Sequence, residues 1–334
     1  MSAVVATIAT LLSRMVGLGT APVLGIVLGL LLGAVIKPRT ALRPGISWSA
    51  SHPLRAAVVV LGAELPLAAV ASQGLRSLPG IIITLTGCLA AARLLGRRLG
   101  IRRHLRALIG VGTSICGASA IAAITPVIDA EQTDVGYAVT TIFLFNIAAV
   151  LVFPPLGHLL GLSQHSFGVF AGTAVNDLSS VLATASLYSA GSLHTAVIVK
   201  LTRTLMIVPI CVILGHRFRT PTAPQAPASA GQHHAAHPPA LARRARNIAK
   251  LVPGFLVAFA ALAALRGTGI IPASQAGTVS EVATLLITLA LSAVGLSVDL
   301  AALRRAGLKP LMLGATLWVI VSLLSLTCQA VGLM

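Results

Sequence analysis

Long apolar runs, separated by short basic or glycine- and proline-containing segments, follow one another along the whole chain. A helix needs about 20 mostly apolar residues to cross the hydrocarbon core of a bilayer. The pattern predicts eleven such helices, or ten if the weak first run is left out. Their expected ranges are 3–18, 20–36, 54–72, 78–96, 105–128, 135–160, 166–190, 194–215, 248–266, 279–300 and 308–332. The expected fold class is therefore an all-α, polytopic membrane protein.

The composition supports this prediction, because too few residues are charged to cover a surface that faces water. Of the 334 residues, 56% are hydrophobic and only 9% are charged, whereas soluble domains carry about 25% charged residues. The net charge of +17 raises the question of nucleic acid, but aromatic residues make up only 4% and the basic residues lie between apolar runs. This distribution is typical of the loops of a membrane protein, so no nucleic-acid partner is expected.

The basic loops also predict the orientation in the membrane. Basic residues gather after the second, fourth, eighth and tenth runs, which all fall on one side if eleven helices cross. Because positively charged loops stay in the cytoplasm, this side is expected to be cytoplasmic, with the N-terminus inside and the C-terminus outside. The acidic loop 129–134 contains no basic residue and is expected on the opposite side.

A segment rich in proline and alanine divides the chain into two parts. Residues 1–219 would hold helices 1–8, residues 220–247 a cytoplasmic linker that also contains histidines, and residues 248–334 helices 9–11. Histidines in such a biased segment are typical of a low-complexity linker rather than of a metal site. No metal ion is therefore expected.

Two internal similarities indicate repeats, from which many transporters are built. Residues 62–78 match residues 295–311 at seven of seventeen positions. These two helices would run in opposite directions, as an inverted repeat requires. Residues 111–119 match residues 171–179 through a Gly-Thr pair and a serine. Under the eleven-helix count this second pair would run parallel, so we interpret it as two similar ways of interrupting a helix at membrane depth.

The stretch 110–123, GVGTSICGASAIAA, is unusual for an apolar run because it combines three glycines with several hydroxyls. Glycine weakens a helix interior by about 1 kcal/mol relative to alanine. An interrupted helix exposes free N–H groups at the start of its second half, and these attract anions. Thr113, Ser114 and Ser119 are expected to supply hydroxyls at this point. Close packing against a crossing helix would also explain the glycines, but it explains the hydroxyls less well.

Four charged residues lie well inside the expected spans, away from their ends, where charges are expensive and commonly functional: Glu64, Asp177, Lys200 and Arg203. Lys200 and Arg203 share one helix face and need a negatively charged partner. That partner is Asp177, Glu64 or an anionic substrate; contact of both cations with lipid headgroups is the alternative. Asp177, beside Asn176, is either a structural partner of the two cations or a carboxylate that couples transport to protons or another cation.

No sequence motif indicates an enzyme, and none is expected. GVGTSICG lacks the lysine of a nucleotide-binding loop, and no His, Cys and acidic residues have metal-binding spacing. The four cysteines are scattered through apolar runs, which is typical of small buried side chains. No cofactor is expected beyond a coupling proton or sodium ion.

Several segments together resemble the YeiH-like sulfate exporter family of bacterial inner-membrane proteins. They are GTSICGASAIAAITPVI, FGVFAGTAVNDLSSVLATA, AVIVKLTRTLMIVP and VGLSVDLAALRRAGLKPL, in the same order, over about 54–215 and 280–320. The resemblance implies a bacterial inner-membrane location and a fold like that of bile-acid and anion transporters, with inverted repeats and crossing discontinuous helices. It also implies export of an anion. The chain departs from the family pattern at Asn176, where a histidine is usual, and at Ser180, where a glutamine is usual.

The expected function is secondary active transport of a small oxyanion, sulfate or a sulfonate, by alternating access. A sodium–proton antiporter and a membrane sensor that binds without transporting are the alternatives. The expected partners are the anionic substrate and membrane lipids, with a homodimer as one form of assembly. The coupling ion is assigned to Asp177 and Glu64. The expected substrate-binding residues, in part carried over from the resemblance, are Thr113, Ser114, Cys116, Gly117, Ser119, Asn176, Lys200 and Arg203.

Overall fold

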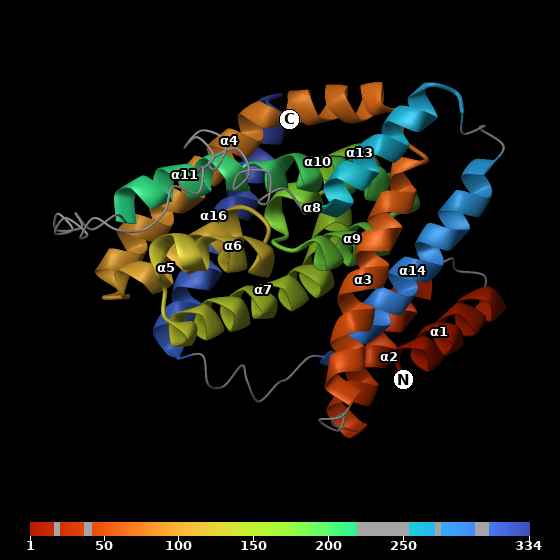
Figure 1. Cartoon of the computed structure of the whole chain (residues 1–334), viewed down its shortest axis with the longest axis horizontal. Coiled ribbons are helices and arrows are strands. Elements are labelled where there is room, and N and C mark those ends of the chain that lie inside the picture. Colours follow the sequence, from red (N-terminus) through yellow and green to blue (C-terminus); the bar gives the residue numbers. More distant parts are fainter. Residues whose placement is uncertain (17–20, 37–41, 219–253, 271–274, 298–306) are drawn as a thin grey trace, which may run out of the picture.

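The computed structural model describes residues 1–16, 21–36, 42–218, 254–270, 275–297 and 307–334 (Figure 1). Within these ranges all regular elements are helices, as the apolar pattern predicts. Five of them are long and apolar enough to cross a membrane: 67–98, 132–159, 190–215, 277–297 and 308–330. The predicted linker 220–247 and part of the predicted repeat at 295–311 lie outside the described residues.

The helices differ widely in length, and several are too short to cross a bilayer alone. In chain order they are α1 (Ser2–Val16), α2 (Ala21–Ile36), α3 (Arg43–Gly62), α4 (Leu67–Arg98), α5 (Arg103–Ser114), α6 (Ala118–Ile128), α7 (Gln132–Leu159), α8 (Gln164–Ala174), α9 (Leu178–Tyr188), α10 (Ala190–Leu205), α11 (Ile207–Phe218), α13 (Gly254–Gly267), α14 (Ala276–Ser297) and α16 (Leu308–Ala330). The predicted ranges 20–36, 135–160 and 308–332 agree with α2, α7 and α16 to within a few residues.

The predicted span 54–72 is wrong. The chain leaves the helix at Gly62 and starts a new one at Leu67, with Pro66 in an extended conformation at its N-cap. The residue before a proline is disfavoured in a helix, so Pro66 ends the run that its apolar neighbours would continue. Helix α4 instead continues through the predicted loop near residue 75 and passes Pro79, with a bend along its length (Figure 1).

Helices α1, α2, α3 and α14 gather on one flank of the molecule (Figure 1). The tightest contact joins α2 to α14 through glycines. A Cβ atom on Gly29 would lie 2.5 Å from the Ser292 carbonyl oxygen, and one on Gly295 would lie 2.5 Å from the Ile26 carbonyl oxygen. Small residues at such crossings let backbones approach closely, which is how helices associate in a membrane without a hydrophobic driving force.

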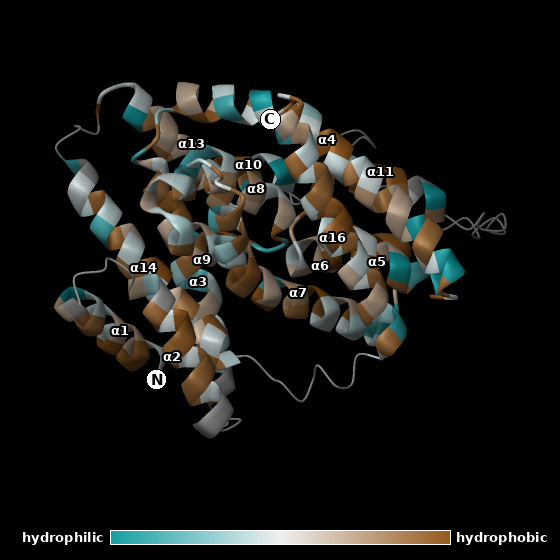
Figure 2. Ribbon diagram, turned by 180° about the vertical axis from the view of Figure 1, so that it is seen from behind, coloured by the Kyte–Doolittle hydropathy of each residue, from teal (hydrophilic) through white to brown (hydrophobic). Residues whose placement is uncertain are grey.

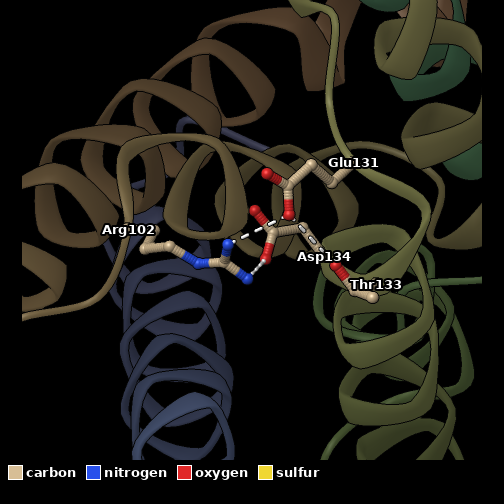
Figure 3. A network of polar contacts seen from close by, with 4 residues as sticks. All are labelled: Arg102, Glu131, Thr133 and Asp134. Atoms are coloured by element: carbon tan, nitrogen blue, oxygen red, sulfur yellow. Dashed lines mark hydrogen bonds and ion pairs between the residues drawn. The ribbon is translucent and has the colours of Figure 1, made fainter.

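The predicted span 105–128 does not cross the molecule, because α5 and α6 fold back on each other as a hairpin. At its open end the Arg102 guanidinium binds Asp134 at 2.5 Å and Glu131 at 3.1 Å (Figure 3). Midway along, a Cβ on Gly112 would lie 3.0 Å from the Ile121 side chain. With 12 residues, α5 reaches about 18 Å, roughly half of a bilayer with its headgroups.

The predicted span 166–190 forms a second hairpin, from α8 and α9. The Tyr188 hydroxyl, at the end of α9, donates to the Leu162 carbonyl just before α8. The Tyr188 ring also stacks on Phe167, with ring centroids 3.8 Å apart. Because both ends of the segment meet, the expected pair of crossing discontinuous helices is replaced by two re-entrant hairpins.

The two hairpins enter from opposite ends of the molecule. The open end of α5–α6 meets the last turn of α11, where Arg103 donates to the Arg217 carbonyl at 2.6 Å. The open end of α8–α9 instead meets Ala190, the first residue of α10. The helix pair α10–α11 therefore connects the two ends, since residues 190–215 are long enough to span a bilayer. The prediction that segments 111–119 and 171–179 run parallel is wrong.

The interpretation that those segments interrupt their helices in similar ways agrees with the helix boundaries. Helix α5 ends at Ser114 and α8 at Ala174, while α6 covers Ala118–Ile128 and α9 covers Leu178–Tyr188. The corresponding helix boundaries at the two tips are thus sixty positions apart. Each hairpin is followed by a long helical segment, α7 or α10–α11.

One end of the molecule carries most of the described basic residues of α4, α5 and α11, and we call it the basic end. Figure 2 shows hydrophilic residues gathered at this end, where α5 and α11 come together. The acidic loop 129–134 lies at this same end, bound to Arg102, so its predicted position on the opposite side is wrong. The hairpin explains the error, because the chain returns to the end from which it entered.

Candidate functional site at the hairpin tips

The tips of the two hairpins meet at the centre of the helix packing. Each tip is a short non-helical segment, residues 115–117 between α5 and α6 and residues 175–177 between α8 and α9. Gly117 has a φ of 67°, and a Cβ there would lie 3.3 Å from the Asp177 Cβ. A side chain at Gly117 would therefore strain the backbone and crowd the opposite tip.

Lys200, on α10, is fully buried and binds both tips. Its Nζ donates to the carbonyls of Ile115 and Val175, each at 2.9 Å, and to the carbonyl of Asn176. Three carbonyl acceptors match the three N–H donors of an ammonium group. The interrupted backbone of both tips thus supplies the acceptors for Lys200.

Arg203 lies one turn further along α10 and binds the ends of the first half-helices. Its Nε donates to the Ser114 carbonyl at 2.6 Å and its guanidinium also donates to the carbonyls of Thr113 and Thr173. These carbonyls have lost their helical partners because α5 and α8 stop here. A cation also stabilises the negative end of a helix dipole. The predicted basic pair therefore completes the two broken helices.

Asp177 is an acidic residue at the N-terminal, positive end of a half-helix, whereas Arg203 binds the negative ends of α5 and α8. It is the N-cap of α9, where its carboxylate accepts from the Ser180 N–H at 3.4 Å and from the Ser179 hydroxyl. In the part of the chain that the structure describes, no ion pair joins Asp177 to Lys200 or Arg203. The first residues of α6, in contrast, have only Gly117 as their N-cap and no side-chain cap.

The balance of formal charge at the tips is positive. The four half-helix ends contribute two negative and two positive dipole ends, which cancel to a first approximation. Lys200 and Arg203 add two positive charges, and Asp177 adds one negative charge when ionised. With all three groups ionised, one net positive charge remains at the tips, beside the buried Lys200 and Arg203. Such a region favours an anion.

Several polar groups at the tips are buried without a hydrogen-bond partner. They are the Thr113 hydroxyl, both polar atoms of the Asn176 amide and Oδ1 of Asp177. Asn176 and Thr113 are each only 1% exposed. Buried polar groups are almost always paired, since an unpaired one costs about 1–3 kcal/mol. These unpaired groups can hydrogen-bond to a polar ligand or to a buried water molecule.

The other predicted site residues, Ser114, Cys116 and Ser119, differ in their burial and in their hydrogen bonds. Ser114 is buried and its hydroxyl donates to the Val111 carbonyl of its own helix, while its own carbonyl accepts from Arg203. Cys116 is buried at the α5–α6 tip, and Ser119 is exposed in the first turn of α6.

Glu64 lies apart from the tips. It lies between α3 and α4 and binds the His194 Nε2 at 2.5 Å, and it forms no ion pair with Lys200 or Arg203. His194 is six residues before Lys200 on α10, about 9 Å along the helix axis. Glu64 is therefore separate from the two tips that it was expected to serve.

Three residues at the tips were missed by sequence reasoning as site residues. The Asn146 Oδ1, from α7, accepts from the Asn176 N–H at 3.2 Å. The Thr173 hydroxyl, at the end of α8, is hydrogen-bonded to the Ser325 hydroxyl of α16. Asn146 could have been found as a single amide within a long apolar run, a rare and commonly functional feature. Ser325 carries no such signal, because hydroxyls are common in membrane helices.

Within the described residues no group of three His, Cys, Asp or Glu side chains could hold a metal ion. The tips instead offer backbone amides, hydroxyls, one amide side chain and buried cations. These groups suit a ligand with several acceptor oxygens.

The comparisons with known proteins agree with the segments that indicated a family. The family described as Conserved hypothetical protein 698 matches residues 1–314. The chain belongs to this YeiH-like UPF0324 family. A UPF0324 membrane protein of Streptococcus agalactiae is 38% identical over 319 residues, which cover 93% of this chain and 90% of that protein.

Two further UPF0324 relatives cover the chain equally well. One from Streptococcus pyogenes is 40% identical over 326 residues, covering 95% of this chain and 91% of the relative. One from Clostridium tetani is 33% identical over 317 residues, covering 95% and 90%. Their names state that they are membrane proteins, in agreement with the apolar helices of this family member. No solved structure gives a significant match.

Proposed function

We propose that this UPF0324 family member is a secondary transporter of a small oxyanion, sulfate or a sulfonate. The observation that carries the proposal is the cluster of buried, unpaired polar groups where the hairpin tips meet, beside two buried cations. Thr113 and the Asn176 amide would bind the oxyanion directly, with the first N–H groups of α6 and the exposed Ser119. All three N–H groups of Lys200 bind carbonyls, so Lys200 acts on the substrate through its charge.

The protonation state of Asp177 would couple transport to protons. With Asp177 ionised the tips carry one net positive charge, and with Asp177 protonated they carry two. A divalent anion such as sulfate is then best matched when Asp177 holds a proton. Binding of the anion and of the proton would therefore favour each other, which is the thermodynamic requirement for coupled movement.

The arrangement of the hairpins supports alternating access. Two similar hairpins that enter from opposite ends and meet at their tips form an inverted repeat, the arrangement that lets a central site open to either side. In this proposal the basic end faces the cytoplasm. The C-terminus faces outside, because Met334 packs beside Gly80, well away from the basic end of α4.

The test is flux of labelled sulfate or an alkylsulfonate in proteoliposomes, with and without a pH gradient. Asn176→Ala is expected to reduce uptake by about tenfold or more, because a bidentate polar contact is worth at least 1.4 kcal/mol. Thr288→Val is the matched control, since Thr288 is buried in α14 and its hydroxyl binds only the Thr284 carbonyl of its own helix. Binding without exchange would indicate a sensor, and normal flux in Asn176→Ala would contradict the proposed site.

Asp177→Asn separates coupling from binding. The variant keeps the shape of the side chain but cannot ionise, so its flux is expected to lose its dependence on the pH gradient. Sodium dependence must be measured in the same vesicles. Equal flux of the variant and the native chain at every pH and sodium concentration would contradict coupling through Asp177.

A sodium–proton antiporter is the second candidate. The observation that favours it is that two unpaired acceptor oxygens, Asp177 Oδ1 and Asn176 Oδ1, lie at neighbouring positions of one tip. Two buried cations beside them disfavour a sodium ion. The antiporter predicts sodium–proton exchange in vesicles without sulfate or any sulfonate, whereas the oxyanion transporter predicts none.

A further inference from the structure

A cavity of about 710 Å³ opens between α4, α5 and α11 at the basic end and reaches Val111, one turn before the tip of the first hairpin. Five arginines line it: Arg93 and Arg97 from α4, Arg103 and Arg106 from α5, and Arg217 from α11. Five cations from three helices therefore surround one space.

The described residues provide no counter-charge for these arginines. None of the five forms an ion pair with a carboxylate in the described ranges, and Arg93, Arg97 and Arg103 each repel the charge on Arg106. Of the three carboxylates in the loop 129–134 at this end, Glu131 and Asp134 bind Arg102, which does not line the cavity (Figure 3). Asp129 forms no ion pair with a described residue. Outside the described ranges the sequence contains one carboxylate, Asp299, and the segment 219–253 contains none.

Two contacts hold Arg103, one of the five arginines, in place. The Arg103 guanidinium lies 4.1 Å from the centre of the Phe218 ring and donates to the Arg217 carbonyl. Cation–π stacking and this hydrogen bond fix Arg103 between α5 and α11. The cavity therefore has a pre-arranged cationic wall.

The part of the cavity further from the basic end is apolar. Leu85 and Leu89 line it from α4, two to three turns before Arg97, and Ile210 and Leu214 line it from α11. A small inorganic anion would lose its hydration here without gaining a partner. A molecule with an anionic head and an apolar tail would match both parts. Ile213, another lining residue, is 49% exposed on the outer surface of α11, so the cavity borders the surface that lipid would cover.

We propose that this cavity binds an anionic phospholipid, with its phosphate groups among the five arginines and its acyl chains along the apolar part. Arginine forks bind phosphate oxygens in pairs, and basic pockets between membrane helices suit lipids that carry two phosphates. The lipid would bridge α4, α5 and α11 at the open end of the first hairpin. It is therefore a structural ligand, distinct from the oxyanion at the tips.

The test measures the Kd of cardiolipin for the purified protein in neutral detergent by native mass spectrometry, with phosphatidylcholine and inorganic phosphate as comparison ligands. The variant is Arg93→Gln with Arg97→Gln, because both side chains are exposed on α4 and their loss leaves the packing intact. The matched control is Arg14→Gln with Arg98→Gln, which removes the same charge from exposed positions that do not line the cavity. A second variant, Leu89→Trp, fills the apolar part.

We expect cardiolipin to bind more tightly than phosphatidylcholine, and its Kd to rise about tenfold or more in the cavity double variant and in Leu89→Trp. The control double variant should keep the native Kd. Equal losses in the two double variants would overturn the proposal, because they would show attraction to total charge alone. Inorganic phosphate that competes at the concentration of the lipid, or unchanged binding in Leu89→Trp, would also overturn it by assigning the arginines to a soluble anion.

Discussion

At the scale of single residues, Lys200 and Arg203 show why buried cations can persist in a membrane protein. Both are fully buried, and their donors are directed at backbone carbonyls that lost their helical partners at the ends of α5 and α8. The carbonyls need donors and the cations need acceptors, so each offsets the desolvation of the other. The hydrogen bonds of both cations therefore stabilise the tips whether or not a substrate is bound.

Arg203→Met is therefore expected to destabilise the protein strongly. The change leaves the carbonyls of Thr113, Ser114 and Thr173 without their side-chain donor, and each unpaired buried carbonyl costs about 1–3 kcal/mol. Thermal unfolding in detergent is the measurement, with the exposed Lys309→Met as control. An unchanged unfolding temperature for Arg203→Met would mean that water or another donor satisfies these carbonyls.

At the scale of elements, each hairpin consists of two short half-helices. Side-chain contacts join the two half-helices at the open end, and Lys200 binds the backbone at the tip. The α5–α6 hairpin depends on a buried carboxylate, because the Asp134 side chain is 2% exposed and is bound by the 57% exposed Arg102. The α2–α14 contact depends on backbone approach at glycines. Neither the Arg102–Asp134 ion pair nor the glycine contact produces a periodic pattern of hydrophobic residues in the sequence.

Arg102→Gln should loosen the open end of the α5–α6 hairpin. The buried Asp134 carboxylate would lose its cationic partner, which costs more than the loss of an exposed ion pair. Hydrogen exchange of residues 129–135 is expected to speed up. Glu131→Gln is the control, since the Glu131 side chain is 68% exposed and its loss should change exchange little. Similar exchange in both variants would contradict the importance of the buried carboxylate.

Gly29→Leu should separate α2 from α14. A side chain at this position meets the Ser292 carbonyl, and a Cβ alone would already lie at 2.5 Å, so the backbone must move. We expect a lower unfolding temperature and a smaller yield of folded protein in detergent. Gly45→Leu is the control, because nothing lies within 4 Å of a Cβ there. Equal behaviour of the two variants would show that α2 and α14 pack less closely.

At the scale of the whole molecule, the two hairpins decide which loops share a side. The α6–α7 turn lies at the basic end with Arg102, while the α7–α8 turn lies at the other end of α7. A chain in which the segments 105–128 and 166–190 each crossed the membrane would give a different assignment. Loop accessibility therefore tests the architecture directly.

Thr133→Cys and Arg98→Cys should react with an impermeant thiol reagent from the same side of the membrane, and Leu160→Cys from the opposite side. All three positions are exposed at helix ends, and the four native cysteines are buried. The measurement is labelling of right-side-out and inverted vesicles. Labelling of Thr133→Cys from the side opposite to Arg98→Cys, with Leu160→Cys on the side of Arg98→Cys, would restore a crossing helix at 105–128 and contradict the hairpin.

The sequence by itself determined the membrane class, most helix locations and the segments that form the tips. These follow from local properties: apolar runs of sufficient length, glycine and hydroxyl residues that interrupt them, and charges too expensive to occur there by chance. The similarity of residues 111–119 and 171–179 even marked both tips. The break at Pro66 also had a local signal, but the apolar residues around it concealed it.

Only the tertiary structure decided that each interrupted segment turns back instead of crossing. Hydropathy depends on how apolar a segment is and carries no information on its direction after an interruption. The direction is set by contacts between residues far apart in the chain, such as Arg102 with Asp134 and Tyr188 with Leu162. The same is true of Lys200, whose partners are backbone carbonyls 24 to 85 positions away and therefore leave no pattern in the sequence.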